Sequence, residues 1–206
     1  MAQYNPFPPK HMINIYGAGK TWAAENLRDL RDNHGFNIIS RWIDIQHVLK
    51  GPEDTFNYES DEMKSTDLGT LWDKGCKMDS TFCDLNLTLA QEADGEMHSG
   101  SLVELGQTSA CFAYIQIQKP VYVIGSCRSF EQVGHSDRAW KFQRCFHHFP
   151  DLDYIAGAEA AIKHYQQHYA LDWVKWRKYL IKNDMIKAMH EYCGVYVDKE
   201  RLPSAM

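Results

Sequence analysis

A loop of serine and glycine followed by one glutamate is the stretch whose residue types are best suited to chemistry. Ser99, Gly100 and Ser101 stand before an apolar segment, 102–117, whose hydrophobic residues recur with helical spacing. Either serine can cap that helix, the glycine allows close approach of a ligand, and the N–H groups of a first turn favour an anion. Glu104 follows Ser101 by three residues. That spacing fits a capping box, and it also places a catalytic carboxylate about one turn into the helix.

Two glycines after a short apolar segment form a second group of candidates. Residues 12–16 predict a strand, and the Gly-Ala-Gly-Lys of residues 17–20 predicts the turn after it. Tyr16, Gly17 and Gly19 would then lie at the carboxyl end of a strand, where open α/β sheets bind ligands. The glycine pattern lacks the spacing of a P-loop and is too short for the dinucleotide fingerprint. By itself it therefore identifies no ligand.

Arg41 and Trp42 form the third group, at the end of a strand predicted over residues 36–40. A guanidinium at this place can clamp an anion, and an indole can stack on a flat ring. The alternative is a surface ion pair beside a tryptophan at the edge of the core. The sequence leaves both interpretations open.

The elements that must position these residues alternate between strand and helix. Strands are predicted at 12–16, 36–40, 83–90, 119–125 and 144–149, and helices at 21–32, 61–80, 102–117, 155–169 and 171–192. This alternation predicts an α/β fold with a doubly wound, mainly parallel, Rossmann- or flavodoxin-like sheet and an added C-terminal helix. Residues 1–170 are predicted to form the α/β domain. Residues 171–206 form a helical extension that packs on the core or on a second subunit.

The composition excludes several classes of function. The chain has 206 residues, of which 44% are hydrophobic and 24% charged, and its net charge is -5. A nucleic-acid polymer would need a basic face, so it is not expected as a partner. No apolar run approaches the roughly 20 residues of a membrane span. The six cysteines form no CxxC pair and no signal peptide is recognised, which predicts reduced thiols and a cytoplasmic location.

Histidines raise the question of a metal. His164 and His168 stand four residues apart, a spacing that can hold a metal on one helix face, and His147-His148 form a second pair. The sequence gives no evident third ligand near them. The prediction is a solvated helix face and no metal site.

Three stretches, in this order, carry a resemblance to a known family. Residues 15–19 read Ile-Tyr-Gly-Ala-Gly, and residues 83–84 are Cys-Asp before a buried strand. Residues 99–106 read Ser-Gly-Ser-Leu-Val-Glu-Leu-Gly, with Lys-Pro-Val following at 119–121. They resemble the opening strand and turn, the aspartate before a strand, and the Ser-Gly-Thr-x-x-Glu-x-Gly…Gly-Lys-Pro-Val block of the nucleoside 2-deoxyribosyltransferase-like superfamily. That family contains base-exchanging transferases and N-glycosidases that hydrolyse nucleoside monophosphates. The resemblance covers about residues 12 to 165.

The resemblance implies an enzyme without cofactor or metal that assembles as a homo-oligomer. By it, Glu104 is the nucleophile that attacks C1′ of the sugar as the base departs, which gives a covalent glycosyl-enzyme. Tyr16 orients Glu104 by hydrogen bonding. Asp79 protonates or orients the base, a role for which Asp73 competes, and Asp84 has a structural role at the start of its strand.

The resemblance also indicates where substrate binds. Six positions before the glutamate, the transferases often carry Asp and the nucleotide hydrolases Ser, whereas this chain has His98. A partly protonated imidazole attracts phosphate, so a nucleoside 5′-monophosphate is favoured over a free nucleoside. The alternative is that His98 is only a surface loop residue. The predicted substrate-binding residues are Gly17, Gly19, Arg41, Trp42, His98, Ser99, Gly100 and Ser101.

Two questions of function remain open in the sequence. Gln118 stands where the family has a glycine before the lysine, and such departures leave hydrolysis and transfer as alternatives. A non-catalytic nucleotide-binding or sensing module of the same fold would need Glu104 only as a helix cap. An interaction protein would act through the tryptophan-rich C-terminal helix. For the enzyme and for the sensing module, the expected partner is a small-molecule nucleoside or nucleotide.

Overall fold

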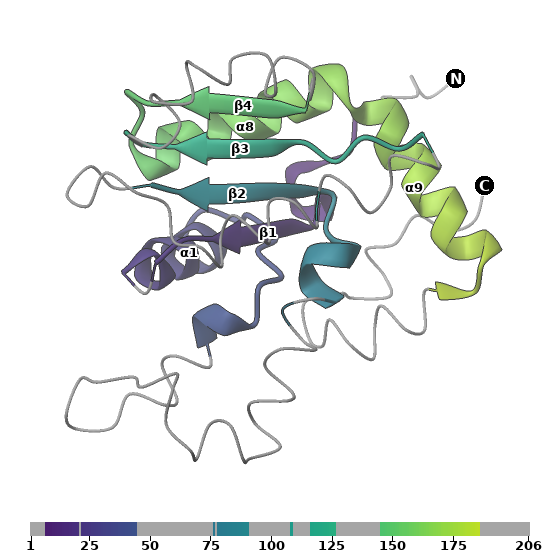
Figure 1. Ribbon diagram of the computed structural model, residues 1–206, viewed down its shortest axis with the longest axis horizontal. Coiled ribbons are helices and arrows are strands. Elements are labelled where there is room, and N and C mark those ends of the chain that lie inside the picture. The colour runs from purple at the N-terminus through teal and green to yellow at the C-terminus, as the bar shows by residue number, and fades with distance from the viewer. Residues whose placement is uncertain are drawn as a thin grey trace, which may run out of the picture.

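A parallel sheet forms the centre of the molecule (Figure 1). A computed structural model describes residues 7–20, 22–44, 76, 78–90, 108, 116–126 and 145–185. The strands, in their order across the sheet, are β1 (Ile15–Ala18), β2 (Leu85–Leu89), β3 (Val121–Ile124) and β4 (Phe146–Phe149). All three pairings between neighbours are parallel. The predicted α/β fold with a parallel sheet is therefore confirmed.

The segment 36–40 lies along the outer edge of β1. Ile38 forms an isolated parallel bridge with Ile15, whose N–H donates to the carbonyl of Asn37 and whose carbonyl accepts from Ile39. The order across the sheet is thus 36–40, β1, β2, β3, β4. The segment that follows β1 in the sequence, 36–40, lies on one side of β1, whereas β2 and the later strands lie on the other side. The direction in which strands are added to the sheet therefore reverses between β1 and β2. Open sheets bind ligands outside the carboxyl ends of strands at such a reversal.

Two helices cover one face of the sheet, and glycines let them come close to it. They are α1 (Ala23–Asp32) and α8 (Tyr154–His168). A Cβ on Gly17 would lie 2.6 Å from Leu27 Cδ2 of α1, and a Cβ on Gly157 of α8 would lie 2.5 Å from Ile124 Cγ2. The sheet register places Gly17 and Ile124 on the same face. Both helices therefore pack on that face.

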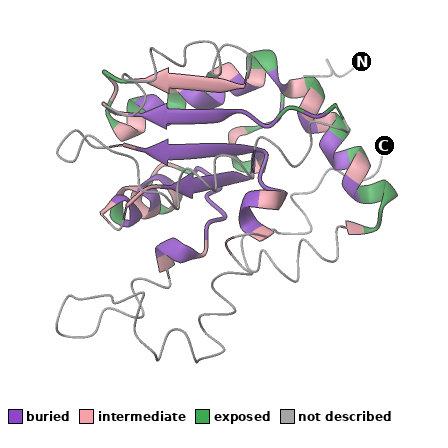
Figure 2. Cartoon of the chain, in the orientation of Figure 1, coloured by how far each residue is buried: buried purple, intermediate pink, exposed green. Residues whose placement is uncertain are grey.

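A third helix, α9 (Ala170–Lys182), crosses near the amino ends of the strands (Figure 1). Every residue of β1, β2 and β3 is buried, as expected for central parallel strands (Figure 2). One side of α9 belongs to the same hydrophobic cluster as these strands. Its buried residues are Trp173, Trp176, Arg177 and Leu180.

The first strand is displaced from its predicted position. Residues Lys10–Met12 form a 3₁₀ turn, so β1 begins at Ile15 rather than at residue 12. It continues through Gly17 and Ala18, which the sequence predicted as a turn. Ala18 still pairs with Thr88 of β2, and this pairing extends the strand.

Two predicted helices are not continuous over their predicted ranges. Gln116 has a φ of 59°, a left-handed conformation that ends helical geometry before Ile117. Asp184, with a φ of 52°, likewise interrupts the helix predicted over 171–192, and α9 ends at Lys182. Of the helix predicted at 61–80, the described residues 76 and 78–82 are helical, so its end lies two residues later than predicted.

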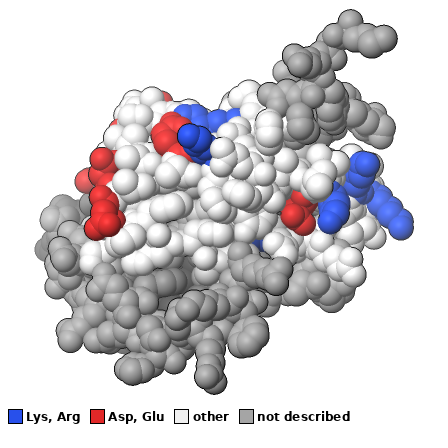
Figure 3. Space-filling model, turned by 90° about the horizontal axis from the view of Figure 1, so that it is seen from above, with Lys and Arg blue, Asp and Glu red and all other residues white. Residues whose placement is uncertain are grey.

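The surface carries mixed charge. On the face seen in Figure 3, the described acidic and basic side chains stand in small groups separated by uncharged surface. Among the described helices, none combines the length and the apolar character that a membrane crossing requires.

Candidate functional site

The carboxyl ends of β1 and β2 are packed tightly around Gly19. A Cβ at this position would lie 2.6 Å from Ala23 Cβ and 3.2 Å from the carbonyl oxygen of Leu89. A side chain would therefore collide with both α1 and the end of β2. Packing alone explains the glycine that the sequence analysis assigned to substrate binding, and it brings the turn after β1 to the place where the strand order reverses.

Two side chains hold the backbone of Gly17. Its N–H donates to Ser40 Oγ at 2.6 Å, and its carbonyl accepts from Trp42 Nε1 at 2.7 Å. In a continuing parallel ladder these partners would be the backbone of Ile39 and Arg41. Because side chains take their place, the pairing along β1 ends and the chain turns away after Ser40.

Trp42 is accordingly a core residue. Only 5% of it is exposed, and its ring N–H is used by the hydrogen bond to β1. This matches the alternative of a tryptophan at the edge of the core. Ser40, which was not among the predicted site residues, is fully buried, and its hydroxyl accepts a hydrogen bond from the N–H of Gly17. A serine at a strand end does not by itself indicate this contact, because the sequence does not show which glycine on a neighbouring strand will lie beside it.

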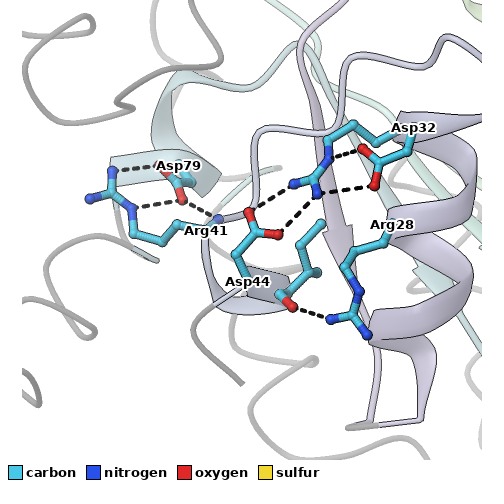
Figure 4. A network of polar contacts seen from close by, with 7 residues as sticks. Arg28, Asp32, Arg41, Asp44 and Asp79 are labelled. Carbon is cyan, nitrogen blue, oxygen red and sulfur yellow. Dashed lines mark hydrogen bonds and ion pairs between the residues drawn. The ribbon is translucent and has the colours of Figure 1, made fainter. Parts of the chain in front are cut away.

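Arg41 and Asp79 form a two-point ion pair (Figure 4). Nε lies 3.0 Å from Oδ2 and Nη2 lies 2.8 Å from Oδ1, while the backbone N–H of Arg41 donates to Oδ2 at 2.9 Å. The carboxylate is completely buried, whereas 26% of the arginine side chain is exposed. A carboxylate that accepts from a guanidinium in this way is suited to accepting hydrogen bonds rather than to giving up a proton.

A second set of ionic contacts fixes the same segment to α1 (Figure 4). Arg31 donates to both carboxylate oxygens of Asp44, at 2.8 and 3.0 Å. Arg28 donates to the carbonyl of Ile43. Residues 40–44 are thereby held on three sides, by β1, by Asp79 and by α1.

The aspartate at the start of β2 has the structural role predicted for it. Both oxygens of Asp84 accept from Arg177 of α9, at 2.6 and 2.7 Å, and Oδ2 also accepts from the N–H of Asn14 at 2.6 Å. Lys119, from the Lys-Pro-Val stretch, is likewise structural. It is 2% exposed, it donates to the carbonyl of Thr81, and its Nζ lies 3.8 Å from the ring centroid of Trp176.

The opposite face of the sheet carries buried polar residues, of which the sequence pointed to Tyr16 but not to Asn86 or Thr88. Tyr16 is fully buried in β1, and its cross-strand partner is Asn86 of β2. The hydroxyl of Thr88 donates to Asn86 Oδ1, but Asn86 Nδ2 is buried without a hydrogen-bond partner. Burial raises the pKa of the nearby Cys83 to about 12, so this thiol is neutral and no nucleophile.

The remaining predicted site residues are His98, Ser99, Gly100, Ser101 and Glu104, and they lie outside the described residues. The chain leaves β2 at Ala90, on the edge where the strand order reverses, and the stretch with these residues follows. Their roles stay predictions. Within the described ranges, no three His, Cys, Asp or Glu side chains are placed to hold a metal ion.

No family model, curated protein or solved structure matches the chain.

The hydrogen bond from Trp42 to β1 is expected to contribute measurably to stability. Trp42→Phe is expected to lower the free energy of unfolding by about 1–3 kcal/mol, because it leaves the Gly17 carbonyl without that partner in the core. Trp173→Phe is the matched control, since the Trp173 ring N–H is buried without a hydrogen-bond partner. Urea denaturation followed by circular dichroism measures both. Equal losses in the two variants would mean that only ring volume matters.

Proposed function

We propose that the chain cleaves or transfers at the N-glycosidic bond of a nucleoside or nucleoside 5′-monophosphate. Glu104 is the nucleophile and a covalent glycosyl-enzyme is the intermediate. The observation that supports this most directly is that separate stretches of the family resemblance meet in space. Residues 15–18 of the first stretch form β1, which pairs with β2, the strand that follows Cys83-Asp84. Residues 40–44 lie beside β1, where they hold Gly17, and Arg41 binds Asp79.

In this proposal the ion pair positions rather than reacts. Asp79 is occupied by Arg41, so it serves to orient groups at the base, and proton donation to the base is not assigned to it. Arg41 is in turn held by the buried carboxylate. A guanidinium fixed in this way can receive an anionic or carbonyl group of the substrate without first losing conformational freedom.

The sugar end of the substrate is assigned to the stretch after β2. His98, Ser99 and Ser101 supply donors for a 5′-phosphate, and a helix N-terminus adds favourable electrostatics. Glu104, one turn further on, then faces the anomeric carbon. Departure of the base from C1′ leaves positive charge on the sugar, and a carboxylate is the group that stabilises and traps it.

Product analysis tests the proposal. The protein is incubated with ribo- and deoxyribonucleosides and their 5′-monophosphates, and free base is measured by liquid chromatography. Release of base from at least one of them is the expected result, and a new nucleoside that forms only after a second base is added identifies transfer. Calorimetric binding of a nucleotide with no release of base, under any acceptor condition, would instead support a sensing module and contradict the proposal.

A further inference from the structure

Three imidazoles from two elements are in contact on the face covered by α8. We call His147 of β4 together with His164 and His168 of α8 the histidine cluster. The ring centroids of His147 and His164 are 4.2 Å apart, and those of His164 and His168 are 4.3 Å apart. The sequence predicted a solvated helix face at 164 and 168. The structure instead adds a strand residue to that pair and partly buries His164.

Two tyrosine hydroxyls, one from β3 and one from the residue that ends α8, form hydrogen bonds with the cluster. Tyr122 OH lies 3.0 Å from His164 Nδ1, and Tyr169 OH lies 2.9 Å from His147 Nε2. The ring of Tyr122 also stacks on that of His147, with centroids 5.0 Å apart. Strands β3 and β4, helix α8 and the residue that ends it are therefore joined through these five rings.

The described surroundings of the cluster disfavour positive charge on its rings. No described carboxylate forms an ion pair with any of the three imidazoles. Burial, followed by repulsion from His164 and His168, lowers the pKa of His147 to about 4. The pKa of His164 is lowered by burial and then by His168. The surroundings thus favour the neutral form of both rings.

The other titratable groups nearby do not remove this effect. Burial raises the pKa of Tyr122 on β3, of Tyr169 after α8 and of Cys145 before β4, so all three are neutral when histidines titrate. Asp172 of α9 acts on Tyr169 and accepts a hydrogen bond from the N–H of Gln118. Among the described residues, it forms an ion pair with Lys175, at 4.0 Å, and none with the three imidazoles.

We propose that the histidine cluster is an acid-sensitive contact that holds α8 on β3 and β4 only while its imidazoles are neutral. Protonating two of three touching rings places like charges side by side in a partly desolvated site. The charges are relieved when the C-terminal part of α8 separates from β4. Acidification would therefore loosen α8, and with it the turn into α9, before the rest of the sheet unfolds.

The direction of the pH effect follows from linkage. A histidine whose folded-state pKa is lowered costs no stability above the ordinary value near 6.5, where both states are neutral. As the pH falls below that value, the unfolded chain binds protons that the folded chain does not. Stability is then lost progressively until the folded-state pKa is reached, which for His147 is about 4.

Nuclear magnetic resonance titration of the imidazole protons tests the cluster directly. In the wild-type protein, the pKa values of His147 and His164 are expected to lie below the ordinary value near 6.5. His168→Gln removes an exposed imidazole and should raise the pKa of both remaining rings. His11→Gln, which replaces another exposed histidine, is the control and should change neither.

Amide hydrogen exchange tests whether α8 loosens when the cluster is protonated. Between about pH 7.5 and about pH 5, amides of α8 near residues 164–168 are expected to lose protection before those of β2. His168→Gln should reduce this loss, and His11→Gln should not. If His147 and His164 titrate like ordinary histidines, or if α8 and β2 lose protection together, the proposal is overturned.

Discussion

Glu104→Gln is expected to reduce the release of base from a nucleoside or nucleotide substrate by about 10³-fold or more. The amide has nearly the size and polarity of the carboxylic acid, so the fold and the ground-state contacts should persist. It lacks the negative charge that stabilises the developing oxocarbenium ion, and its neutral oxygen is a much weaker nucleophile toward C1′ than a carboxylate oxygen. The change should therefore appear in kcat, with little effect on the affinity for substrate.

Two comparisons separate a nucleophile from a helix cap. Glu159→Gln removes an exposed carboxylate of α8, 53% exposed at its side chain, and should leave the rate unchanged. Azide added to Glu104→Ala should restore turnover and give a glycosyl azide, because a small anion can occupy the space of the missing carboxylate. A Glu104→Gln protein that keeps its full rate would contradict the assignment, and the reading of Glu104 as a cap would stand.

The positions of the strands were predictable because they are short apolar runs between polar turns. Such runs must be buried on both faces of a parallel sheet, and this fixes Leu85–Leu89 and Val121–Ile124 within a residue or two. The end of β1 was not predictable in the same way. Glycines normally indicate a turn, but Gly17 remains in the strand because Leu27 of α1 occupies the space that a side chain would need.

Contacts between residues that are far apart in the sequence could not be predicted from it. The ion pair between Arg41 and Asp79 joins two residues 38 positions apart, and neither position has a periodicity that indicates the other. The histidine cluster was missed for the same reason, because its third ring comes from another element. Short buried strands can be located from one sequence, because their own apolar composition indicates burial. Residues that act in pairs across the fold need the topology first.

Arg177→Met is expected to lower the free energy of unfolding by about 3–5 kcal/mol. The guanidinium is the two-point partner of Asp84 and also donates to the carbonyl of Met12 at 3.2 Å. The side chains of this pair are 4% and 0% exposed. Without the arginine, a carboxylate remains in the core, and among the described groups only the N–H of Asn14 stabilises its charge. Methionine retains most of the packing on α9, so the loss is mainly electrostatic.

The double variant Asp84→Asn/Arg177→Met shows whether an unpaired charge causes the loss. An asparagine there keeps an acceptor for Asn14 and carries no charge, so the double variant should be more stable than Arg177→Met alone. Glu159→Gln breaks the exposed ion pair with Lys10 and should change stability by at most about 1 kcal/mol. Urea denaturation at neutral pH measures all three. Equal stability of the single and double variants would mean that the arginine acts through packing alone, and α9 would then be held on the sheet by its tryptophans rather than by charge.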